Sequence, residues 1–324
     1  MGFKHILEAL AVGDAMGMPT EFMTQKDIDR IYPGIRGLLD PQKSYTHPTL
    51  PFAAVTDDTE QNLYLIRAYL AAGEITVDNS AAALSCWVKE CDAVAKKYIG
   101  PSSARALEAI ENGVSPLEAG RGGTTCGGIM RTPALVLCSG NSSREKLLED
   151  IRRGCIPTHH TSQAIAAAAG YGFALRAAME GKGLEQILDE AMLGTEMALQ
   201  SMDYVAAAPS CGCRLRYLRR HLPADAQALR EDLYDNFGTG LPSIDIFGAV
   251  FALLMFCGKD VFGGICLAAS LGGDTDTIAA LYGALAAAYA GGHNIPGDVL
   301  SGVTAENHLE PDALSREIER TFWN

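Results

Sequence analysis

The sequence predicts an all-α protein, and three observations support this fold class. Hydrophobic residues make up 48% of the 324 residues but aromatic residues only 7%, so Ala and Leu fill much of the core, which favours close-packed helices over β-sheets. Helical patterns recur along the whole chain, whereas no segment has a convincing strand pattern. Because no linker-like stretch separates two cores, residues 1–324 are predicted to form a single domain.

Apolar periodicity and stop signals place the helices of the first third of the chain. An opening helix is expected over residues 3–16 and a second over 57–72, which stops at Gly73; two more follow over 80–99 and 103–112. Before the second helix, four prolines predict an irregular loop over residues 33–51, namely Pro33, Pro41, Pro48 and Pro51. This loop leads to a polar cluster and is a candidate lid.

Later helices are expected over residues 162–180, 184–201, 245–257, 260–270 and 277–290, the last ended by Gly291 and Gly292 with Pro296 beyond. The stretch 246–257 is uncharged and apolar but shorter than the about 20 residues that cross a bilayer. We therefore expect it to be a buried core helix.

Charge and cysteine content limit the possible partners and setting. The chain has 26 basic and 39 acidic residues, a net charge of −13, which repels nucleic-acid phosphate and disfavours general nucleic-acid binding. The first residues lack a signal-peptide layout and a myristoylation motif, so no membrane attachment is expected. Nine scattered cysteines without a CxxC pair favour a reduced, cytoplasmic setting. The oligomeric state stays open.

Two acidic segments, Thr56-Asp57-Asp58-Thr59 and Asp274-Thr275-Asp276-Thr277, each come directly before an apolar helix. One interpretation is helix capping, with Asp57 and Glu60 as a capping box and acids that suit the helix dipole. However, one carboxylate is enough to cap a helix, and each segment offers two together with hydroxyl groups. The pair therefore also fits a binding site.

If the two helix starts converge, the four carboxylates repel each other by about 4 kcal/mol per pair at an effective dielectric constant near 20. Two divalent cations would neutralise the −4 of Asp57, Asp58, Asp274 and Asp276. Oxygen-only ligands, including the hydroxyls of Thr56 and Thr277, select Mg²⁺ or Mn²⁺ over zinc. Gly272 and Gly273, just before the second segment, would let the backbone turn sharply and approach a ligand.

Several motifs together resemble the ADP-ribosylglycohydrolase family, to which dinitrogenase reductase activating glycohydrolase belongs. They are GDAMGMPTEF at 13–22, TDDTE at 56–60, CGGIMRTP at 126–133, THH at 158–160 and LGGDTDTIAALYGAL at 271–285. They occur in the family's order and span nearly the whole chain. The resemblance implies an all-α orthogonal helical bundle with a central cleft, which holds a binuclear Mg²⁺ or Mn²⁺ centre and hydrolyses a glycosidic bond at the ribose of ADP-ribose.

The resemblance also implies a role for individual residues. The implied metal ligands are Thr56, Asp57, Asp58, Asp274, Asp276 and Thr277, and the implied catalytic acid or base is Glu21 or Asp58. The implied substrate-binding residues are Thr125, Cys126, Gly127, Gly128, Met130 and His159. Read without the resemblance, Glu21 would be a solvated residue and His159 a cap or surface residue. Asp14 and Ser243 are expected to support the site through packing or hydrogen bonds.

One position departs from the family pattern. Several members have Gly-Asn-Gly where this chain has Thr125-Cys126-Gly127, and a thiol is a much weaker hydrogen-bonding group than an amide. Three functions remain open: removal of ADP-ribose from a protein side chain such as arginine or from a small molecule; glycosidase action on a free nucleoside-like or other small ribosyl compound; and a non-catalytic role, because the family includes a lens crystallin. The presence of all six candidate ligands disfavours the last.

Overall fold

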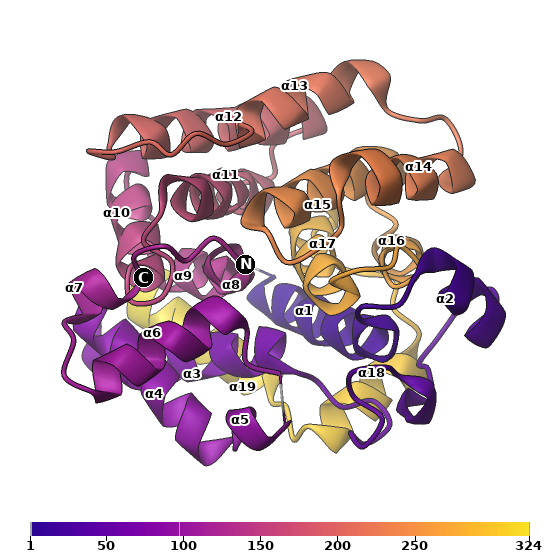
Figure 1. The fold of residues 1–324 in the computed structure, drawn as a ribbon, viewed down its shortest axis with the longest axis horizontal. Coiled ribbons are helices and arrows are strands. Elements are labelled where there is room, and N and C mark those ends of the chain that lie inside the picture. The colour runs from indigo at the N-terminus through magenta and orange to yellow at the C-terminus, as the bar shows by residue number, and fades with distance from the viewer. Residues whose placement is uncertain (1, 97, 324) are drawn as a thin grey trace.

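The computed structural model describes residues 2–96 and 98–323 as a packed set of helices (Figure 1). The helices are α1 Phe3–Gly17, α2 Gln25–Ile31, α3 Asp57–Ala72, α4 Val77–Glu90, α5 Ala93–Lys96, α6 Pro101–Glu111, α7 Pro116–Ala119, α8 Gly127–Met130, α9 Thr132–Cys138, α10 Arg144–Cys155, α11 Ser162–Met179, α12 Leu184–Gln200, α13 Cys211–His221, α14 Ala226–Asp232, α15 Ser243–Cys257, α16 Val261–Ala268, α17 Thr275–Ala290, α18 Gly297–Glu306 and α19 Pro311–Ile318.

The prediction of an all-α fold is confirmed. Within the described part of the chain the only β-type pairing is an isolated antiparallel bridge between Thr125 and Pro242. Helix α3 has the predicted bounds and ends at Gly73, which adopts the left-handed conformation at φ 74°. The helix expected over 80–99 instead ends at Glu90, because Asp92 turns the chain at φ 52° before α5; Lys97 lies outside the described residues.

The loop over residues 33–51 is irregular as predicted, apart from a short turn of 3₁₀ helix at Pro41–Lys43. The stretch 246–257 lies in α15 and is largely buried, as expected. In the described residues, no helix combines the length and apolar character that a membrane span requires. All nine cysteines are free thiols.

Helices α1 and α17 pack against each other with almost no side chain between their backbones. A Cβ atom on Gly13 would lie 2.2 Å from the carbonyl oxygen of Ala279, and one on Gly17 would lie 2.3 Å from that of Thr275. Glycine is the one residue that permits such an approach. This contact fixes the end of α1 beside the start of α17, where the second acidic segment lies.

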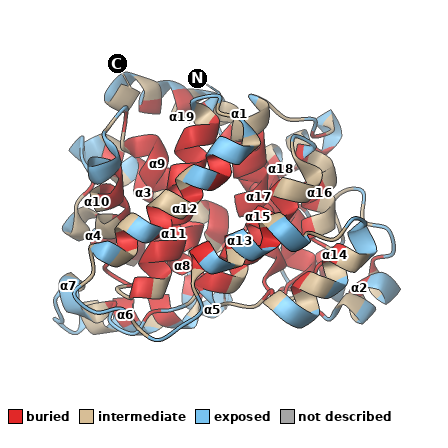
Figure 2. Ribbon diagram, turned by 90° about the horizontal axis from the view of Figure 1, so that it is seen from above, coloured by how far each residue is buried: buried red, intermediate tan, exposed pale blue. Residues whose placement is uncertain are grey.

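Buried residues concentrate on the inner helices, among them α9, α11 and α17, whereas α2, α7 and α14 at the periphery carry many exposed residues (Figure 2). Both ends of the described chain join this core. The rings of Phe3 and Trp323 have centroids 5.1 Å apart, and the Trp323 indole donates a 2.7 Å hydrogen bond to the Leu137 carbonyl.

Candidate metal centre

The start of α3 is held by Asp14, a residue of α1. The Asp14 carboxylate accepts hydrogen bonds from the backbone N–H and hydroxyl of Thr56, at 3.0 and 2.8 Å, and from those of Thr59, at 3.0 and 2.6 Å. These bonds satisfy N–H groups that a local cap would otherwise bind. Asp14 thus supports the site through hydrogen bonds, as expected, and leaves the carboxylates of Asp57 and Asp58 free for other contacts.

Capping explains only part of the acidic segments: Asp276 Oδ1 accepts a 2.9 Å hydrogen bond from the N–H of Thr277 in the first turn of α17. Thr56 and Asp274 occupy the N-cap positions of α3 and α17, yet neither side chain makes a capping hydrogen bond. Glu60 does not close a capping box, because its carboxylate accepts hydrogen bonds from Trp87 and Tyr98 at 2.8 and 2.7 Å. Both segments keep carboxylate oxygens that no helix terminus requires.

Two glycines let the chain turn into α17. Gly272 and Gly273 have φ values of 79° and 82°, which L-residues rarely adopt. A Cβ on Gly273 would lie 2.1 Å from the Thr239 carbonyl oxygen, and that carbonyl accepts a 2.7 Å hydrogen bond from the N–H of Asp274. The sharp turn is confirmed, and the close approach at Gly273 is to the chain itself; that these glycines also approach a ligand stays a prediction.

The two acidic segments meet in one cluster, and Glu21 joins them. The Thr277 hydroxyl donates a 3.1 Å hydrogen bond to Asp58 Oδ2, which links the start of α17 to the start of α3. Glu21, Asp274 and Asp276 each place a carboxylate oxygen within 4.8 Å of the other two. The N–H of Phe22, directly after Glu21, donates to the Gly273 carbonyl at 2.7 Å and so ties Glu21 to this turn.

Burial and mutual repulsion disfavour the ionised form of these carboxyl groups. Burial, and then the neighbouring carboxylates, raise the pKa of Asp57, Asp58 and Asp276 well above the usual range. Burial raises the pKa of Asp274 to about 6. No Lys or Arg in the described residues forms an ion pair with these four aspartates, so no direct pairing neutralises their charge; Arg131 acts on Asp57 only through space.

Three buried oxygens of the cluster have no hydrogen-bond partner: Glu21 Oε2, Asp58 Oδ1 and Asp274 Oδ2. A buried polar atom without a partner is costly, and hard divalent cations bind carboxylate and hydroxyl oxygens. The donor set therefore fits Mg²⁺ or Mn²⁺. Thr56 is fully buried, and its hydroxyl donates to Asp14, which leaves its oxygen lone pairs available.

His47 lies beside Glu21, although no motif of the sequence includes it. Its Nε2 atom is 2.7 Å from Glu21 Oε2, close enough for an ion pair when the ring is protonated, but the contact does not have the geometry of a hydrogen bond. The ring is buried and packs edge-on against Tyr98, with centroids 6.3 Å apart. His47 belongs to the proline-rich loop, so this loop reaches the acidic cluster; no local pattern marks the residue.

Cys126 lies against the carboxylates. Its sulfur lies 3.9 Å from the Thr277 hydroxyl, which donates to it, and the thiol is close enough to Asp274 for each group to shift the pKa of the other. Burial, and next the charges of Asp274 and Asp58, raise the pKa of this thiol well above its usual value, so it stays protonated. The residue that departs from the family pattern thus borders the acidic cluster directly.

His159, expected in the ligand cleft, is completely buried. Its Nε2 lies 2.9 Å from the Thr125 hydroxyl and its Nδ1 lies 3.0 Å from an Arg131 nitrogen. Burial, and then Arg131, lower its pKa well below the usual value, so the ring is neutral. Both ring nitrogens of His159 contact protein side chains. This arrangement supports a role in positioning Thr125 rather than direct contact with a substrate.

The glycine-rich segment packs on this histidine. A Cβ on Gly127 would lie 2.6 Å from His159 Cε1, and one on Gly128 would lie 3.3 Å from His159 Cβ. Ser243 holds the preceding loop through its hydroxyl, which donates to the Thr125 carbonyl at 2.5 Å, in agreement with its expected supporting role. Met130 is buried. Packing thus explains both glycines and Met130, whereas Thr125 and Cys126 lie next to polar groups.

An all-α fold with a buried carboxylate cluster where α1, α3 and α17 meet is the architecture expected above for a glycosidic-bond hydrolase of ADP-ribosyl compounds. The family model for ADP-ribosylglycohydrolase matches residues 3–322. The chain therefore belongs to the ADP-ribosylglycohydrolase family, a family of hydrolases.

Known proteins are similar over nearly their full length. The uncharacterized protein YegU of Escherichia coli strain K12 is 31% identical over 323 residues, covering 96% of this chain and 95% of that protein. ADP-ribosylhydrolase ARH3 of Bos taurus is 24% identical, covering 99% and 93%. A solved structure of an ADP-ribosylglycohydrolase-related protein complex aligns with a TM-score of 0.69 and 27% identity, covering 98% of this chain and 97% of that one.

Proposed function

We propose that the protein is a Mg²⁺- or Mn²⁺-dependent hydrolase that cleaves the glycosidic bond between ADP-ribose and an acceptor, either a protein side chain such as arginine or a small molecule. The observation that carries this proposal is the largely buried cluster of Glu21 and four aspartates, with which no Lys or Arg of the described residues forms a direct ion pair. Family membership supplies the reaction class.

The proposed ligands of two ions are the aspartates and hydroxyls of the acidic segments: Thr56, Asp57, Asp58, Asp274, Asp276 and Thr277. When bound, such ions hold ribose hydroxyls and lower the pKa of a bound water. The hydroxyl groups orient the carboxylates, as Thr277 does by donating to Asp58. The single domain over residues 1–324 and a cytoplasmic setting, which suits nine free thiols, belong to the same proposal.

Proton transfer in this proposal falls to a carboxylate of the cluster. Cleavage at an anomeric carbon passes through an oxocarbenium-like state. It needs a group that removes a proton from water or donates one to the leaving group. Of the two candidates, Asp58 is 1% exposed and already accepts a hydrogen bond from Thr277. Glu21 is 9% exposed, and its Oε2 accepts no hydrogen bond, although it lies beside His47 Nε2. These features favour Glu21 as the acid or base.

A second candidate function is hydrolysis of a free nucleoside-like or other small ribosyl compound. The observation that favours it is Cys126, whose thiol replaces the family's amide directly beside Asp274 and Thr277. A thiol binds polar ligand groups weakly, so part of the ADP-ribose recognition expected of the family is altered at this position.

A product assay tests the proposal. The protein with Mg²⁺ or Mn²⁺ is incubated with arginine-linked, serine-linked and free ADP-ribosyl compounds, and the released sugar is identified. Release of intact ADP-ribose supports the first function, and release of ribose from small compounds supports the second. Asp276→Asn should abolish both metal binding and turnover. Equal turnover by wild-type and Asp276→Asn protein would overturn the metal-dependent mechanism.

A further inference from the structure

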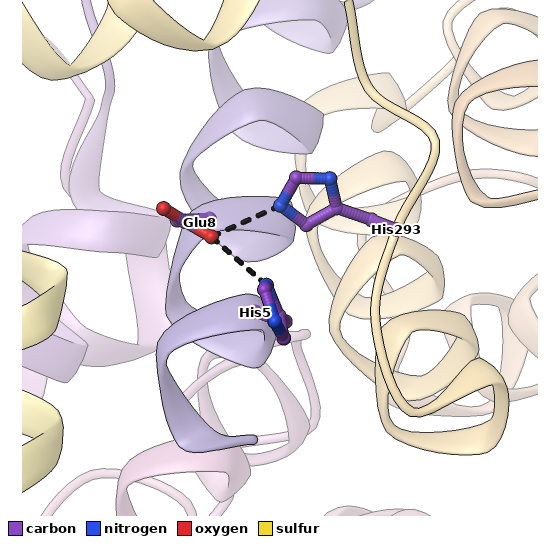
Figure 3. A group of neighbouring side chains, drawn as sticks. All are labelled: His5, Glu8 and His293. Atoms are coloured by element: carbon purple, nitrogen blue, oxygen red, sulfur yellow. Dashed lines mark hydrogen bonds and ion pairs between the residues drawn. The ribbon is translucent and has the colours of Figure 1, made fainter. Parts of the chain in front are cut away.

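A second group of potential metal ligands lies outside the acidic cluster. His5 and Glu8 belong to α1, and His293 lies in the loop that follows α17 (Figure 3). The three side chains each offer one ligand atom, and these atoms all lie within 4.8 Å of one another. Nothing in the proposed hydrolysis uses them.

The geometry of the three side chains matches a small transition-metal ion. Glu8 Oε2 lies 3.2 Å from His5 Nδ1 and 3.0 Å from His293 Nε2, and both rings point at this same oxygen (Figure 3). A tetrahedral ion with bonds of about 2.0–2.2 Å separates its ligand atoms by about 3.3–3.6 Å. The measured separations from the carboxylate oxygen are slightly shorter than that, so the three groups need to move apart by only a few tenths of an ångström to admit an ion.

The three side chains differ in burial, so the group faces the protein interior on one side and solvent on the other. Glu8 is 4% exposed, and the side chains of His293 and His5 are 9% and 39% exposed. The two rings meet edge-on with centroids 5.1 Å apart. An ion held here would have three protein ligands and a free position toward solvent, which is the pattern of a three-ligand zinc site.

Two neighbouring groups, the Lys4 ammonium and the Ile295 N–H, lie beside this site without blocking it. Lys4 Nζ lies 3.7 Å from the other Glu8 oxygen, Oε1, and is paired more closely with Asp312 at 2.9 Å. The Ile295 N–H lies 3.4 Å from His293 Nδ1, a distance at the outer limit of a hydrogen bond. When Nε2 binds an ion, Nδ1 carries the proton and this long contact opens.

We propose that His5, Glu8 and His293 form a separate site for Zn²⁺ or a similar borderline transition-metal ion. Two imidazoles and one carboxylate favour such ions, whereas the acidic cluster with its oxygen ligands favours Mg²⁺ or Mn²⁺. The ion joins α1 to the loop after α17 and stabilises the folded protein by linkage, because the unfolded chain does not bring these residues together. This site is independent of the proposed hydrolysis.

Co²⁺ titration of the chelator-treated protein tests the site, with excess Mg²⁺ present to fill the acidic cluster. Visible absorption reports imidazole and carboxylate coordination, and a thiolate charge-transfer band would reveal binding to cysteine instead. The variants are His5→Ala and His293→Ala. Their matched controls are His221→Ala, which removes an exposed histidine of α13, and Asp58→Asn, which removes a ligand of the acidic cluster.

We expect one Co²⁺ equivalent without a thiolate band in the wild type, lost in His5→Ala and His293→Ala and kept in both controls. Zn²⁺ should raise the melting temperature of the wild type and of the controls, but not of the two histidine variants. His5 lies at the surface edge, so His5→Ala tests the site even if His293→Ala fails to fold. An unchanged Co²⁺ equivalent in His5→Ala, or its loss in Asp58→Asn alone, would overturn the proposal.

Discussion

The backbone contact between α1 and α17 predicts a different outcome for two similar glycine substitutions. In Gly17→Ala the new Cβ would lie 2.3 Å from the Thr275 carbonyl oxygen and 2.5 Å from the Asp276 backbone nitrogen. Real Cβ contacts essentially never fall below 3.0 Å, so the start of α17 must move by at least about 0.7 Å. Because Asp276 lies in that first turn, its carboxylate moves with the backbone.

Two effects should follow from Gly17→Ala. Overpacking of a core contact costs about 1–3 kcal/mol, which for a protein of this size lowers the melting temperature by about 1.5–4.5 °C. Affinity for Mn²⁺ should also fall by about 10–100-fold, as when a group that orients a metal ligand is lost. Differential scanning fluorimetry measures the first effect, and Mn²⁺ titration monitored by electron paramagnetic resonance measures the second.

Gly13→Ala is the matched control. Its Cβ would lie 2.2 Å from the Ala279 carbonyl oxygen, an equal clash one turn further from the acidic segment. The melting temperature should therefore fall by a similar amount while Mn²⁺ affinity changes less than in Gly17→Ala. Equal loss of Mn²⁺ affinity in both variants, or no loss in Gly17→Ala despite a lower melting temperature, would refute the link between this helix contact and the metal centre.

Three further predictions concern the acidic cluster. First, the protein freed of metal ions by a chelator should become more thermostable as the pH falls from about 7 to about 5. The folded-state pKa of Asp274 is raised to about 6. The protonated Asp274 therefore contributes to stability at low pH, and this contribution is lost as the pH rises through that value. A falling melting temperature would contradict this, and saturating Mn²⁺ should flatten the profile. Second, His47→Ala should lower turnover while Mn²⁺ stoichiometry stays unchanged, because Glu21 loses its 2.7 Å neighbour; unchanged turnover would show that His47 does not position Glu21. Third, Cys126→Asn should lower the KM for ADP-ribosyl substrates, and an increased KM would argue against a recognition role.

The helices that the sequence predicted are those with strong local signals. Helix α3 begins at an acidic turn and stops at a left-handed glycine, so its bounds need no tertiary information. Several helices were not predicted, among them α10, α13 and α19, in which the buried apolar residues lie among many charged ones. Their apolar faces are narrow, and the packing that stabilises them involves distant elements.

The candidate site was predictable where a motif is contiguous. Both acidic segments are visible in the sequence, and the structure brings them together. His47 was not predictable, because it reaches Glu21 through an irregular loop that has no periodicity. For His159 the resemblance implied a ligand cleft; the ring is completely buried beside Thr125 and Arg131, and contact with a substrate stays a prediction. Whether a polar side chain faces a cleft or a buried partner depends on tertiary packing, which a short motif does not specify.

The bond from Thr277 to Asp58 joins residues 219 positions apart in the chain. During synthesis, α1 and α3 leave the ribosome long before α17, so the first half of the cluster spends most of translation without its counterpart. Four carboxylates there, Asp14, Glu21, Asp57 and Asp58, would then lack Asp274 and Asp276. A nascent chain that stops short of α17 cannot complete the cluster, so any ion bound by both acidic segments would bind late, after α17 has been made.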